Sequence, residues 1–536
     1  MNDDQDALLV AIEPKRWLCC RCGGTGVDSY GPHLPALRGP RLLLRVFGAP
    51  GVTTHPPRRP PRRGPSRTEP PKPGRDPPIM PSTYAVAGLI TRLHDPQYAR
   101  WASQIRATGG CRQPIHLRGH VHHLDPATGQ RLHTYSTAGE PDGILRVPCK
   151  TRRASRCPAC AETYRSDTYQ LIRAGLVGGK GVPDSVTAHP CLFVTLTAPS
   201  FGTVHTRREK NGTVLPCHAR RDAATCPHGR VMSCTARHGV DEGSLGEPLC
   251  PDCYDYTGSV LFNAMSPELW RRFTEALRRR VAKTAGLTLK ELREQLTISF
   301  AKVAEYQRRG VVHFHAVIRL DGPDGPASPP PAWATADALT DAVRHAVSAV
   351  AVTVPVAGDE PARLLRWGTQ LDIREITMTG DLTEQAVAAY IAKYATKAAE
   401  CVGTLDRRIN PLDDLTALNL RDHARRLIAE CLRLGALDEL ADLRLIQWAH
   451  MLGFRGHFST KSRRYSTTLG KLRAARAEHM RGEAITTGRL PLFDEDTVLV
   501  ISHWEYAGQG YSAGDALLVS ALTGNCLVDP GGCHES

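Results

Sequence analysis

Most of the 17 cysteines in this 536-residue chain crowd between Cys111 and Cys253, which a scattered set of core cysteines would not do. In a reducing compartment, cysteines at CxxC spacing are more often metal ligands than disulfide partners. A chain of this length is also too long for one hydrophobic core, so about two to four domains are expected. The cysteine distribution therefore predicts that part of the fold is built around metal ions.

The first cysteine group lies in residues 81–165, which we expect to form an N-terminal zinc-binding region. Cys157-Pro-Ala-Cys160 has the spacing of a zinc knuckle, and four thiolates suit a closed tetrahedral site. The alternative is that two of the cysteines are core thiols beside an accidental CxxC. We predict a structural Zn²⁺ site with the ligands Cys111, Cys149, Cys157 and Cys160.

The second group lies in an insert, residues 205–258, in which apolar periodicity is poor. Such a segment is expected to be held together by metal rather than by a core. Cys250-Pro-Asp-Cys253 is its firmest pair of ligands. The predicted ligands of this structural zinc are Cys226, Cys234, Cys250 and Cys253, with Cys217, His228 and His238 left open as alternatives.

The charge of the chain indicates its class of partner. Lys and Arg number 68 against 54 Asp and Glu, a formal net charge of +14. Such an excess favours a polyanionic partner, most often nucleic acid, although a basic surface kept for solubility is an alternative. No apolar run approaches the roughly 20 residues of a membrane span, and no signal peptide is evident. We therefore expect a cytoplasmic protein without a membrane partner.

Residues 1–80 differ from the rest of the chain. Proline fills 12 of the 32 positions from Pro50 to Pro81, mixed with arginines. Because proline removes backbone donors and the arginines repel one another, we expect this stretch to be disordered. The sequence also restarts plausibly at Met80, which raises the alternative of a mis-assigned start codon.

A predicted hairpin carries the first candidate catalytic cluster. Its strands are expected over residues 296–307 and 311–320, joined by a three-residue turn that ends in a left-handed Gly310. Residues i and i+2 of a strand share a face, so His313 and His315 project together. The turn places Glu305 opposite His313. Two imidazoles and a carboxylate suit a divalent metal with open positions; the alternative is a structural histidine pair.

The second candidate cluster lies on a helix that is expected to begin at an Asp381 N-cap. Tyr390 and Tyr394 are four residues apart and share one face, with Lys393 and Lys397 beside them. Tyrosines at this spacing usually pack in a core. After a metal-binding hairpin in a basic protein, however, a phenol can attack a phosphodiester that a metal polarises, while a lysine stabilises the developing charge.

These motifs resemble those of a known family. His313-Phe-His315 resembles the HUH motif, and Tyr390-Ile-Ala-Lys393-Tyr394 resembles the YxxKY motif of two-tyrosine rolling-circle initiators, such as those of small single-stranded DNA phages. Phe193-Val-Thr195-Leu-Thr197, which alternates as a strand does, is similar to the first motif of that family. The three motifs follow the family order. Further similarity to initiators of actinomycete rolling-circle plasmids and integrative elements lies in residues 148–160 and 453–465.

The resemblance implies an α+β fold with a ferredoxin-like HUH endonuclease domain, residues 186–400, whose antiparallel sheet carries the histidines. It also implies a site-specific nick at a double-strand origin. Tyr390 or Tyr394 would attack a phosphate, leaving a 5′-phosphotyrosine and a free 3′-hydroxyl that primes replication. The expected cofactor is Mg²⁺ or Mn²⁺, held by Glu305, His313 and His315. The second tyrosine would then cleave the regenerated origin and release a single-stranded circle.

Two further expectations concern helices and DNA. Ser266 and Pro267 are expected to open a helix as N-cap and first residue. Residues 401–536 are expected to form a helical, basic, DNA-binding region, since cations interleaved with aromatic residues suit contacts to phosphates and bases. A solvated basic loop is the alternative there. The candidate DNA-contacting residues are Arg455, Lys461, Arg463, Arg464 and Tyr465.

The expected partners are double- and single-stranded DNA at a replication origin. No Walker A motif is present, so a host helicase is expected to separate the strands. Rival interpretations are an HUH relaxase or transposase, which use the same site for DNA transfer. A zinc-containing transcriptional regulator is a rival of another class, in which the histidines and tyrosines would be core residues.

Overall fold

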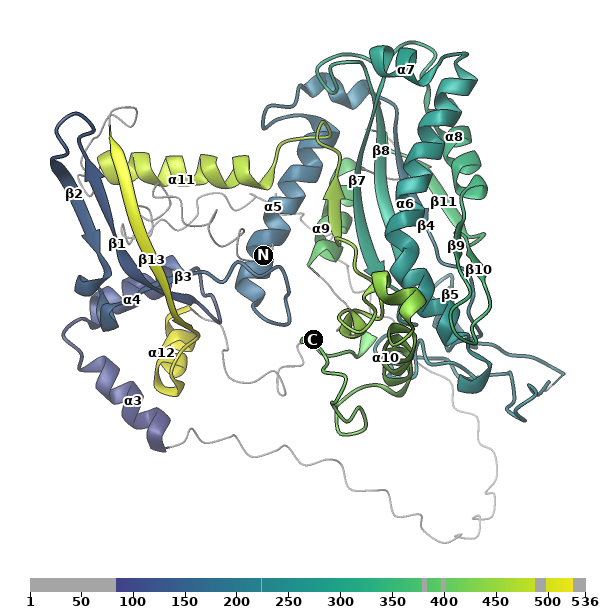
Figure 1. Cartoon of the computed structure of the whole chain (residues 1–536), viewed down its shortest axis with the longest axis horizontal. Coiled ribbons are helices and arrows are strands. Elements are labelled where there is room, and N and C mark those ends of the chain that lie inside the picture. Colours follow the sequence, from purple (N-terminus) through teal and green to yellow (C-terminus); the bar gives the residue numbers. More distant parts are fainter. Residues whose placement is uncertain (1–82, 223, 378–382, 397–401, 487–497, 524–536) are drawn as a thin grey trace, which may run out of the picture.

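The computed structural model describes residues 83–222, 224–377, 383–396, 402–486 and 498–523. The predictions for residues 1–80, including the restart at Met80, lie outside these ranges, as do those for Asp381 and Lys397. The described residues form two bodies (Figure 1). The larger body contains the hairpin and the tyrosine helix, and the smaller one contains the first and last described segments.

The larger body is built on a five-stranded sheet in which each neighbouring pair is antiparallel. The strand order is β11-β4-β8-β7-β12. The strands are β4 (Cys191–Leu196), β7 (Thr297–Tyr306), β8 (Val312–Asp321), β11 (Leu371–Glu375) and β12 (Ser459–Lys461). The α+β class with an antiparallel sheet is therefore confirmed, whereas the ferredoxin-like topology stays a prediction.

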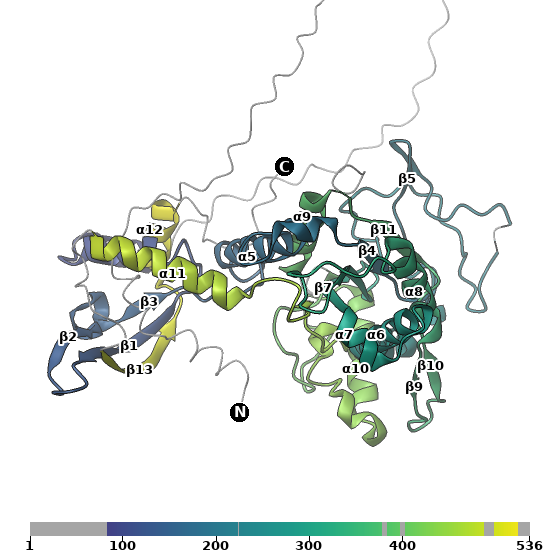
Figure 2. The same cartoon turned by 90° about the horizontal axis from the view of Figure 1, so that it is seen from above.

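Helices cover both faces of this sheet (Figure 2). One face packs against α6 (Tyr256–Thr284), α8 (Ala336–Ala349) and α10 (Asp422–Gly435), and the other against α5 (Pro158–Val177) and α9 (Glu384–Ala395). The alternation of side chains along the strands separates the two cores. Phe314 is fully buried toward α6, while Val303 and Val317 pack toward α5 and α9. Residues next to Phe314 on β8 consequently face the tyrosine helix.

The helix predicted to open with the N-cap Ser266 begins eleven residues earlier, with the N-cap Asp255, which corrects that prediction. The side chain of Asp255 caps α6 by accepting from the Gly258 N–H, and Pro267 lies inside the helix. Proline cannot donate to the carbonyl one turn before it. The Ser266 hydroxyl donates to the Asn263 carbonyl instead, at 2.9 Å, so the helix continues past the proline.

The smaller body joins segments from the two ends of the described chain. Its sheet has the order β13-β1-β2, with β3 also paired to β1. Its elements are α3 (Thr83–Leu93), α4 (Tyr98–Ala107), β1 (Ile115–Leu124), β2 (Arg131–Ser136), β3 (Leu145–Val147), β13 (Leu499–Gln509) and α12 (Ala513–Thr523). The C-terminal region, which is predicted to be helical, contains α10, α11 (Leu469–Thr486) and α12 but also two strands, because β12 and β13 complete two different sheets.

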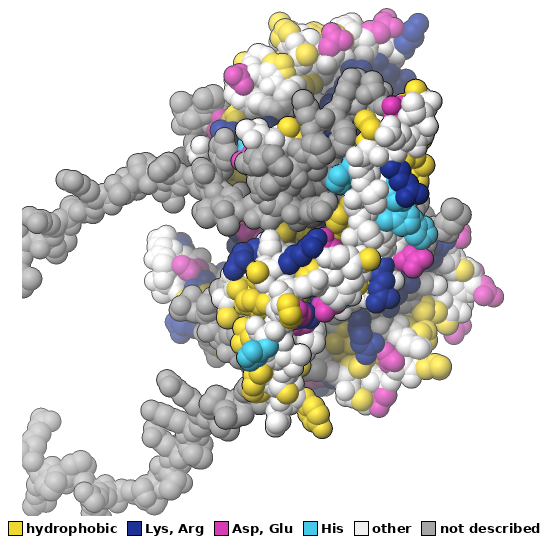
Figure 3. Space-filling model, turned by 90° about the vertical axis from the view of Figure 1, so that its left-hand side faces the viewer, with side chains coloured by type: hydrophobic (Ala, Val, Ile, Leu, Met, Phe, Trp, Pro, Cys, Tyr) yellow, Lys and Arg dark blue, Asp and Glu magenta, His cyan; other side chains and the backbone are white. Residues whose placement is uncertain are grey.

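Figure 3 looks at the smaller body, where histidine and basic side chains lie on the surface beside apolar ones. One face of the sheet of this body carries a group of histidines. His120 and His122 of β1 lie with ring centroids 4.8 Å apart, and His503 of β13 lies 5.9 Å from His120. These three side chains face the same way because His120 and His503 are cross-strand partners.

The helix α11 (Leu469–Thr486) runs from the larger body to the smaller one (Figure 1). It is fixed to α5 by ion pairs, since Arg476 lies 2.7 Å and Arg473 lies 3.6 Å from the buried Asp167. Shorter elements are α7 (Leu289–Gln295), β5 (Arg208–Lys210), β6 (Thr213–Leu215), β9 (Val352–Val354) and β10 (Arg363–Leu365). None of the helices in the described residues combines the length and apolar character needed to cross a membrane.

Candidate functional site

The β7–β8 hairpin forms as the sequence predicts. Gly310 adopts a left-handed conformation with φ +76°, and its N–H donates to the Gln307 carbonyl at 2.8 Å. A side chain at this position would also lie 2.5 Å from Leu427, so glycine is required for two reasons. With the turn fixed, Glu305 and His313 are cross-strand partners, which confirms the predicted register.

Three side chains from this hairpin converge on one point. Oε2 of Glu305 lies 3.0 Å from Nε2 of His313 and 3.0 Å from Nε2 of His315, and the two nitrogens are 3.1 Å apart. Burial alone would raise the pKa of Glu305, but the hydrogen bonds from the two histidines outweigh it and lower the pKa to about 2. The carboxylate therefore stays ionised, and the set of two nitrogens and one oxygen fits a divalent metal ion.

His315 is positioned by residues of β4. Its ring stacks on Phe193 with an interplanar angle of 4° and a centroid distance of 5.8 Å, and its Nδ1 lies 3.0 Å from Oγ1 of Thr195. Burial lowers the pKa of His315, so the ring favours the neutral form that binds metals. The sequence motif pointed to this strand but not to the orienting role of Thr195.

The tyrosine helix begins two residues later than predicted. Its N-cap is Thr383, whose side chain accepts from the Ala386 N–H. Thr383 thus performs the capping role predicted for Asp381, and α9 ends at Ala395. Its apolar face, which includes Val387 and Ile391, packs toward α5 and the sheet. This packing fixes the rotation of the helix.

That rotation brings Tyr390 to the cluster of Glu305, His313 and His315. Its hydroxyl lies 3.1 Å from Nε2 of His315 and 3.4 Å from Oε2 of Glu305. The Tyr394 ring lies farther back, 4.7 Å from the Tyr390 ring and 6.1 Å from the His315 ring. Burial and the Glu305 charge raise the pKa of Tyr390. The two phenols therefore occupy different positions relative to the cluster.

Of the two predicted lysines, Lys393 is exposed on α9, with its Nζ 5.5 Å from the centre of the Tyr394 ring. Its positive charge therefore lies beside the Tyr394 ring on the exposed side of α9. The prediction for Lys397 falls outside the described residues.

A buried ionic network, which the sequence did not indicate, lies farther along β8. Arg319 and Asp321 are completely buried and pair at 2.6 Å. Asp321 also contacts Nδ1 of His189 at 2.8 Å and accepts from the Ser299 hydroxyl at 2.6 Å. Arg319 donates to the Gly175 carbonyl of α5. The network holds α5 on the same face of the sheet as the tyrosine helix.

The four cysteines of the first predicted zinc site come together. Cys111, Cys149, Cys157 and Cys160 place their sulfur atoms within 4.8 Å of one another. Main-chain N–H groups point at two of them, from Arg112 to Cys157 at 3.3 Å and from Cys149 to Cys111 at 3.2 Å. Such donors stabilise thiolates. The cluster joins the smaller body to the start of α5.

The insert forms two clusters rather than one, which corrects the predicted ligand set. Cys234 does not join Cys226, Cys250 and Cys253; the fourth group there is His228, one of the alternatives left open. Cys234 instead lies with His205, Cys217 and His238. Along the chain the clusters alternate in pairs: His205 and Cys217, then Cys226 and His228, then Cys234 and His238, then Cys250 and Cys253. His205 was missed because it precedes the cysteine-rich part of the insert.

The predicted DNA-contacting stretch is only partly exposed. Tyr465 is completely buried, with its hydroxyl donating to the Ile172 carbonyl at 3.1 Å, so its predicted role in stacking on bases is wrong. Lys461 is half-buried and donates to main-chain carbonyls. The exposed cations of the stretch are Arg455, Arg463 and Arg464. DNA contact by these three stays a prediction.

Comparisons with known proteins give one family. The RepSA family, described as "Replication initiator protein, pSAM2", matches residues 97–524, a range that spans the hairpin and the tyrosine helix. A replication initiator protein of Streptomyces ambofaciens is 52% identical over 451 residues, which cover 83% of this chain and 94% of that relative. No solved structure matches the chain.

Proposed function

Because the chain belongs to the RepSA family of plasmid replication initiator proteins, we propose that it starts replication by nicking one strand of its double-strand origin through a tyrosine. Binding of origin DNA follows from the role of an initiator. The observation that carries the nicking proposal is the position of the Tyr390 hydroxyl, 3.1 Å from His315 and 3.4 Å from Glu305. A nucleophile and a candidate metal site then face the same substrate atom.

Glu305, His313 and His315 would hold Mg²⁺ or Mn²⁺, since their three ligand atoms lie 3.0–3.1 Å apart and join a carboxylate oxygen, which suits these ions, to two imidazole nitrogens. When bound, such an ion supplies charge that polarises a phosphate oxygen. Thr195 and Phe193 keep the His315 ring in place. Lys393 lies on the exposed side of α9, where a phosphate can reach it.

In the proposed step, the phenolic oxygen of Tyr390 bonds to phosphorus and the bond from phosphorus to the 3′ oxygen breaks. The tyrosine loses its proton, and the departing 3′ oxygen ends as a hydroxyl that can prime synthesis. A phosphodiester is exchanged for a phosphotyrosine of similar energy, so the strand can be rejoined without ATP. Tyr394 would cleave the regenerated origin, while Tyr390 still holds the 5′ end.

The three Cys/His clusters would bind structural Zn²⁺, because their sulfur and imidazole ligands favour zinc over the harder ions of the nicking site. Because the ligand pairs alternate along the chain, each of the two ions of the insert would stabilise the fold around the other. We call residues 205–228 and 234–253 the two lobes of the insert; each lobe supplies two ligands to each ion. Because neither lobe contains a full ligand set, we expect both ions to be needed for either lobe to fold.

The family membership favours replication over the rival functions of relaxase, transposase or transcriptional regulator. Double- and single-stranded origin DNA are the proposed substrates. A host helicase remains the proposed source of strand separation.

The test is covalent capture. Purified protein is incubated with Mn²⁺ and a labelled oligonucleotide carrying the origin of the cognate element, and a protein–DNA adduct is sought on a denaturing gel. We expect an adduct at one phosphate, and its loss in the double variant His313→Ala/His315→Ala with origin binding largely retained. Nicking by that variant equal to the wild type would remove the metal-site assignment, and a regulator would form no adduct at all.

A further inference from the structure

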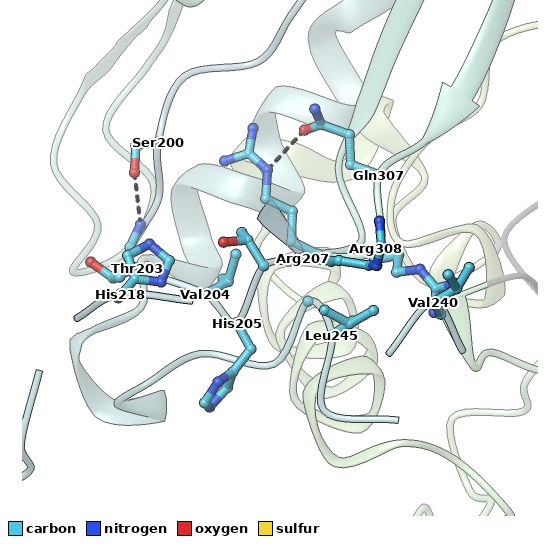
Figure 4. Close-up of a pocket in the computed structure, with 14 residues that line it drawn as sticks. Ser200, Thr203, Val204, His205, Arg207, His218, Val240, Leu245, Gln307 and Arg308 are labelled. Carbon is cyan, nitrogen blue, oxygen red and sulfur yellow. Dashed lines mark hydrogen bonds between the residues drawn. The ribbon is translucent and has the colours of Figure 1, made fainter. Parts of the chain in front are cut away.

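A cavity of about 650 Å³ lies where the turn of the catalytic hairpin meets the insert. Figure 4 shows the residues around it, with Ser200 and Thr203 on one side and Gln307 and Arg308 on the other. Its volume lies in the range of sites that hold small organic ligands. His205, a member of one Cys/His cluster, also lines the cavity, so that cluster shapes one wall.

Arg309 contributes a positive charge to this cavity that is not neutralised by a carboxylate of the described residues. Its guanidinium is partly buried and donates to neutral oxygens: the Gln307 side chain at 2.8 Å and the carbonyls of Pro199 at 2.8 Å and Ala198 at 3.2 Å. It also lies 6.0 Å from the centre of the Phe201 ring. Within the part of the chain that the structure describes, Arg309 forms no ion pair with a carboxylate. A partly buried cation without a counter-ion favours an anionic ligand.

Two exposed arginines extend this charge to the mouth of the cavity. Arg308 donates to the Val240 carbonyl at 2.8 Å and lies 3.6 Å from the highly exposed Asp241. Arg207 pairs with Glu209 at the surface. Because such exposed ion pairs are weak, the guanidinium groups of both arginines can leave their present partners and bind a more highly charged anion. The hydroxyls of Ser200 and Thr203 add neutral hydrogen-bonding groups to the wall.

The cavity lies close to the nicking centre. Gln307 follows Glu305 by two residues at the end of β7, a separation of about 7 Å at the usual strand rise. Successive nucleotides of a strand in B-DNA rise by about 3.4 Å each. A DNA strand with its scissile phosphate at the Glu305 cluster can therefore reach the cavity within about two nucleotides.

From these observations we propose that the cavity binds one nucleotide of the cleaved strand, with its phosphate against Arg207, Arg308 and Arg309 and its base between the hairpin turn and the insert. This proposal rests on the proposed function and adds a second contact to the same strand. It would fix the register of the origin relative to Tyr390 and read a base near the nick. The ligand class is a nucleotide phosphate, which a free nucleotide could also supply.

The test uses single-stranded origin oligonucleotides in which one phosphate at a time is replaced by a neutral methylphosphonate. For the wild-type protein, we expect a neutral linkage one or two nucleotides from the nick to weaken binding about tenfold. The double variant Arg207→Ala/Arg308→Ala should bind the natural oligonucleotide about as weakly, with no further loss at that linkage. Its circular dichroism and zinc content should match the wild type.

Arg279→Ala is the matched control, because Arg279 is an exposed arginine of α6 outside the cavity. It should keep the full sensitivity to the neutral linkage. The proposal would be overturned if the loss of affinity caused by the double variant and the loss caused by the neutral linkage add together. It would also be overturned if no neutral linkage near the nick weakens binding by the wild-type protein. Arginine-dependent binding of dTMP, without competition by DNA, would assign the cavity to a free nucleotide instead. Binding is measured without nicking, so a missing covalent adduct would reject the proposed function and leave this result standing.

Discussion

Oγ1 of Thr195 lies 3.0 Å from Nδ1 of His315, at the ring nitrogen opposite the one that faces Glu305. The two residues are cross-strand partners on β4 and β8. When Nε2 of a histidine binds a metal, Nδ1 carries the proton and needs an acceptor. The oxygen of the Thr195 hydroxyl is that acceptor, so we infer that Thr195 fixes the orientation and the tautomer of the His315 ring.

Thr195→Val should therefore weaken Mn²⁺ binding by about 10–100-fold, the usual effect of losing such a partner. Nicking should fall at low Mn²⁺ and recover at high Mn²⁺, as measured by titrating the ion in the cleavage assay. Thr195→Ser keeps the hydroxyl and should resemble the wild type. An equal loss in both variants at every Mn²⁺ concentration would show that Thr195 acts only through packing.

The unequal positions of the two tyrosines predict unequal roles. The Tyr390 hydroxyl lies 3.1 Å from Nε2 of His315, and its ring lies 4.8 Å from the His315 ring, against 6.1 Å for the Tyr394 ring. Tyr390→Phe should therefore strongly reduce the amount of the initial covalent adduct. The small amount of adduct that remains would be formed by Tyr394 after a small shift of its side chain. Tyr394→Phe should nick normally and fail at termination, so that multimeric single strands accumulate. The double Phe variant should form no adduct.

These outcomes are read from adducts on denaturing gels and from single-stranded products in replicating cells. Release of monomer circles by Tyr394→Phe at the wild-type level would show that one tyrosine suffices. A stronger initial adduct in Tyr390→Phe than in Tyr394→Phe would reverse the assigned order.

The alternating ligand pairs of the insert predict coupled metal loss. Purified wild-type protein should contain three zinc ions per chain, one for each Cys/His cluster. Cys157→Ser should lose one, whereas Cys234→Ser should lose both ions of the insert, because each lobe depends on the other for its ligands. Zinc is measured by elemental analysis against protein concentration.

Cys431→Ala is the control, since Cys431 is a buried cysteine of α10 outside the clusters. It should keep all three ions. Loss of a single ion from Cys234→Ser would show that the two lobes fold independently.

The burial of Lys302 predicts a pH-dependent loss of stability. Lys302 lies on the face of the sheet opposite Glu305, His313 and His315. Its Nζ lies 3.9 Å from the centre of the Phe314 ring and 5.5 Å from that of Trp270. Burial lowers its pKa to about 7, below the ordinary lysine value of about 10.4. Between these two values the unfolded chain binds more protons than the folded one, so stability falls as the pH falls, and the full cost is present below pH 7.

Lys302→Met should therefore raise the free energy of unfolding by a few kcal/mol (about 1.4 per unit of pKa shift) at pH 6–7. The gain should shrink as the pH rises toward 10. Urea unfolding of both proteins at pH 6, 7.5 and 9 measures the difference. A gain that does not change with pH would mean that Lys302 titrates normally and that the added stability comes from packing alone.

The features that could be predicted from the sequence are those that depend on residues close together in the chain. The pairing of Glu305 with His313 depends on a short turn and on the two-residue period of a strand. Both could be predicted from the residues between them. The first cysteine site was predicted for a similar reason, because Cys157 and Cys160 form a spaced pair with few competing ligands nearby.

Long-range packing explains the failures. Tyr465 was predicted to contact DNA because basic residues surround it, yet its ring fills a space on α5. A side chain on Gly175 would lie 2.3 Å from that ring, so the space exists only because residue 175 is glycine. Cys234 was assigned to the wrong cluster because seven candidate ligands lie close together in sequence. Spacing alone does not divide such a set between two ions.

The pairing of β1 with β13 has a consequence for how the molecule is made. Residues 125–498 separate the two strands, and the whole β7–β8 hairpin and α9 lie within that interval. During translation the larger body can therefore fold while one edge of β1 still lacks its neighbour. The smaller body closes only after Leu499–Gln509 leaves the ribosome, so a nascent chain that stops early would carry both tyrosines but retain an open sheet edge, a feature prone to aggregation.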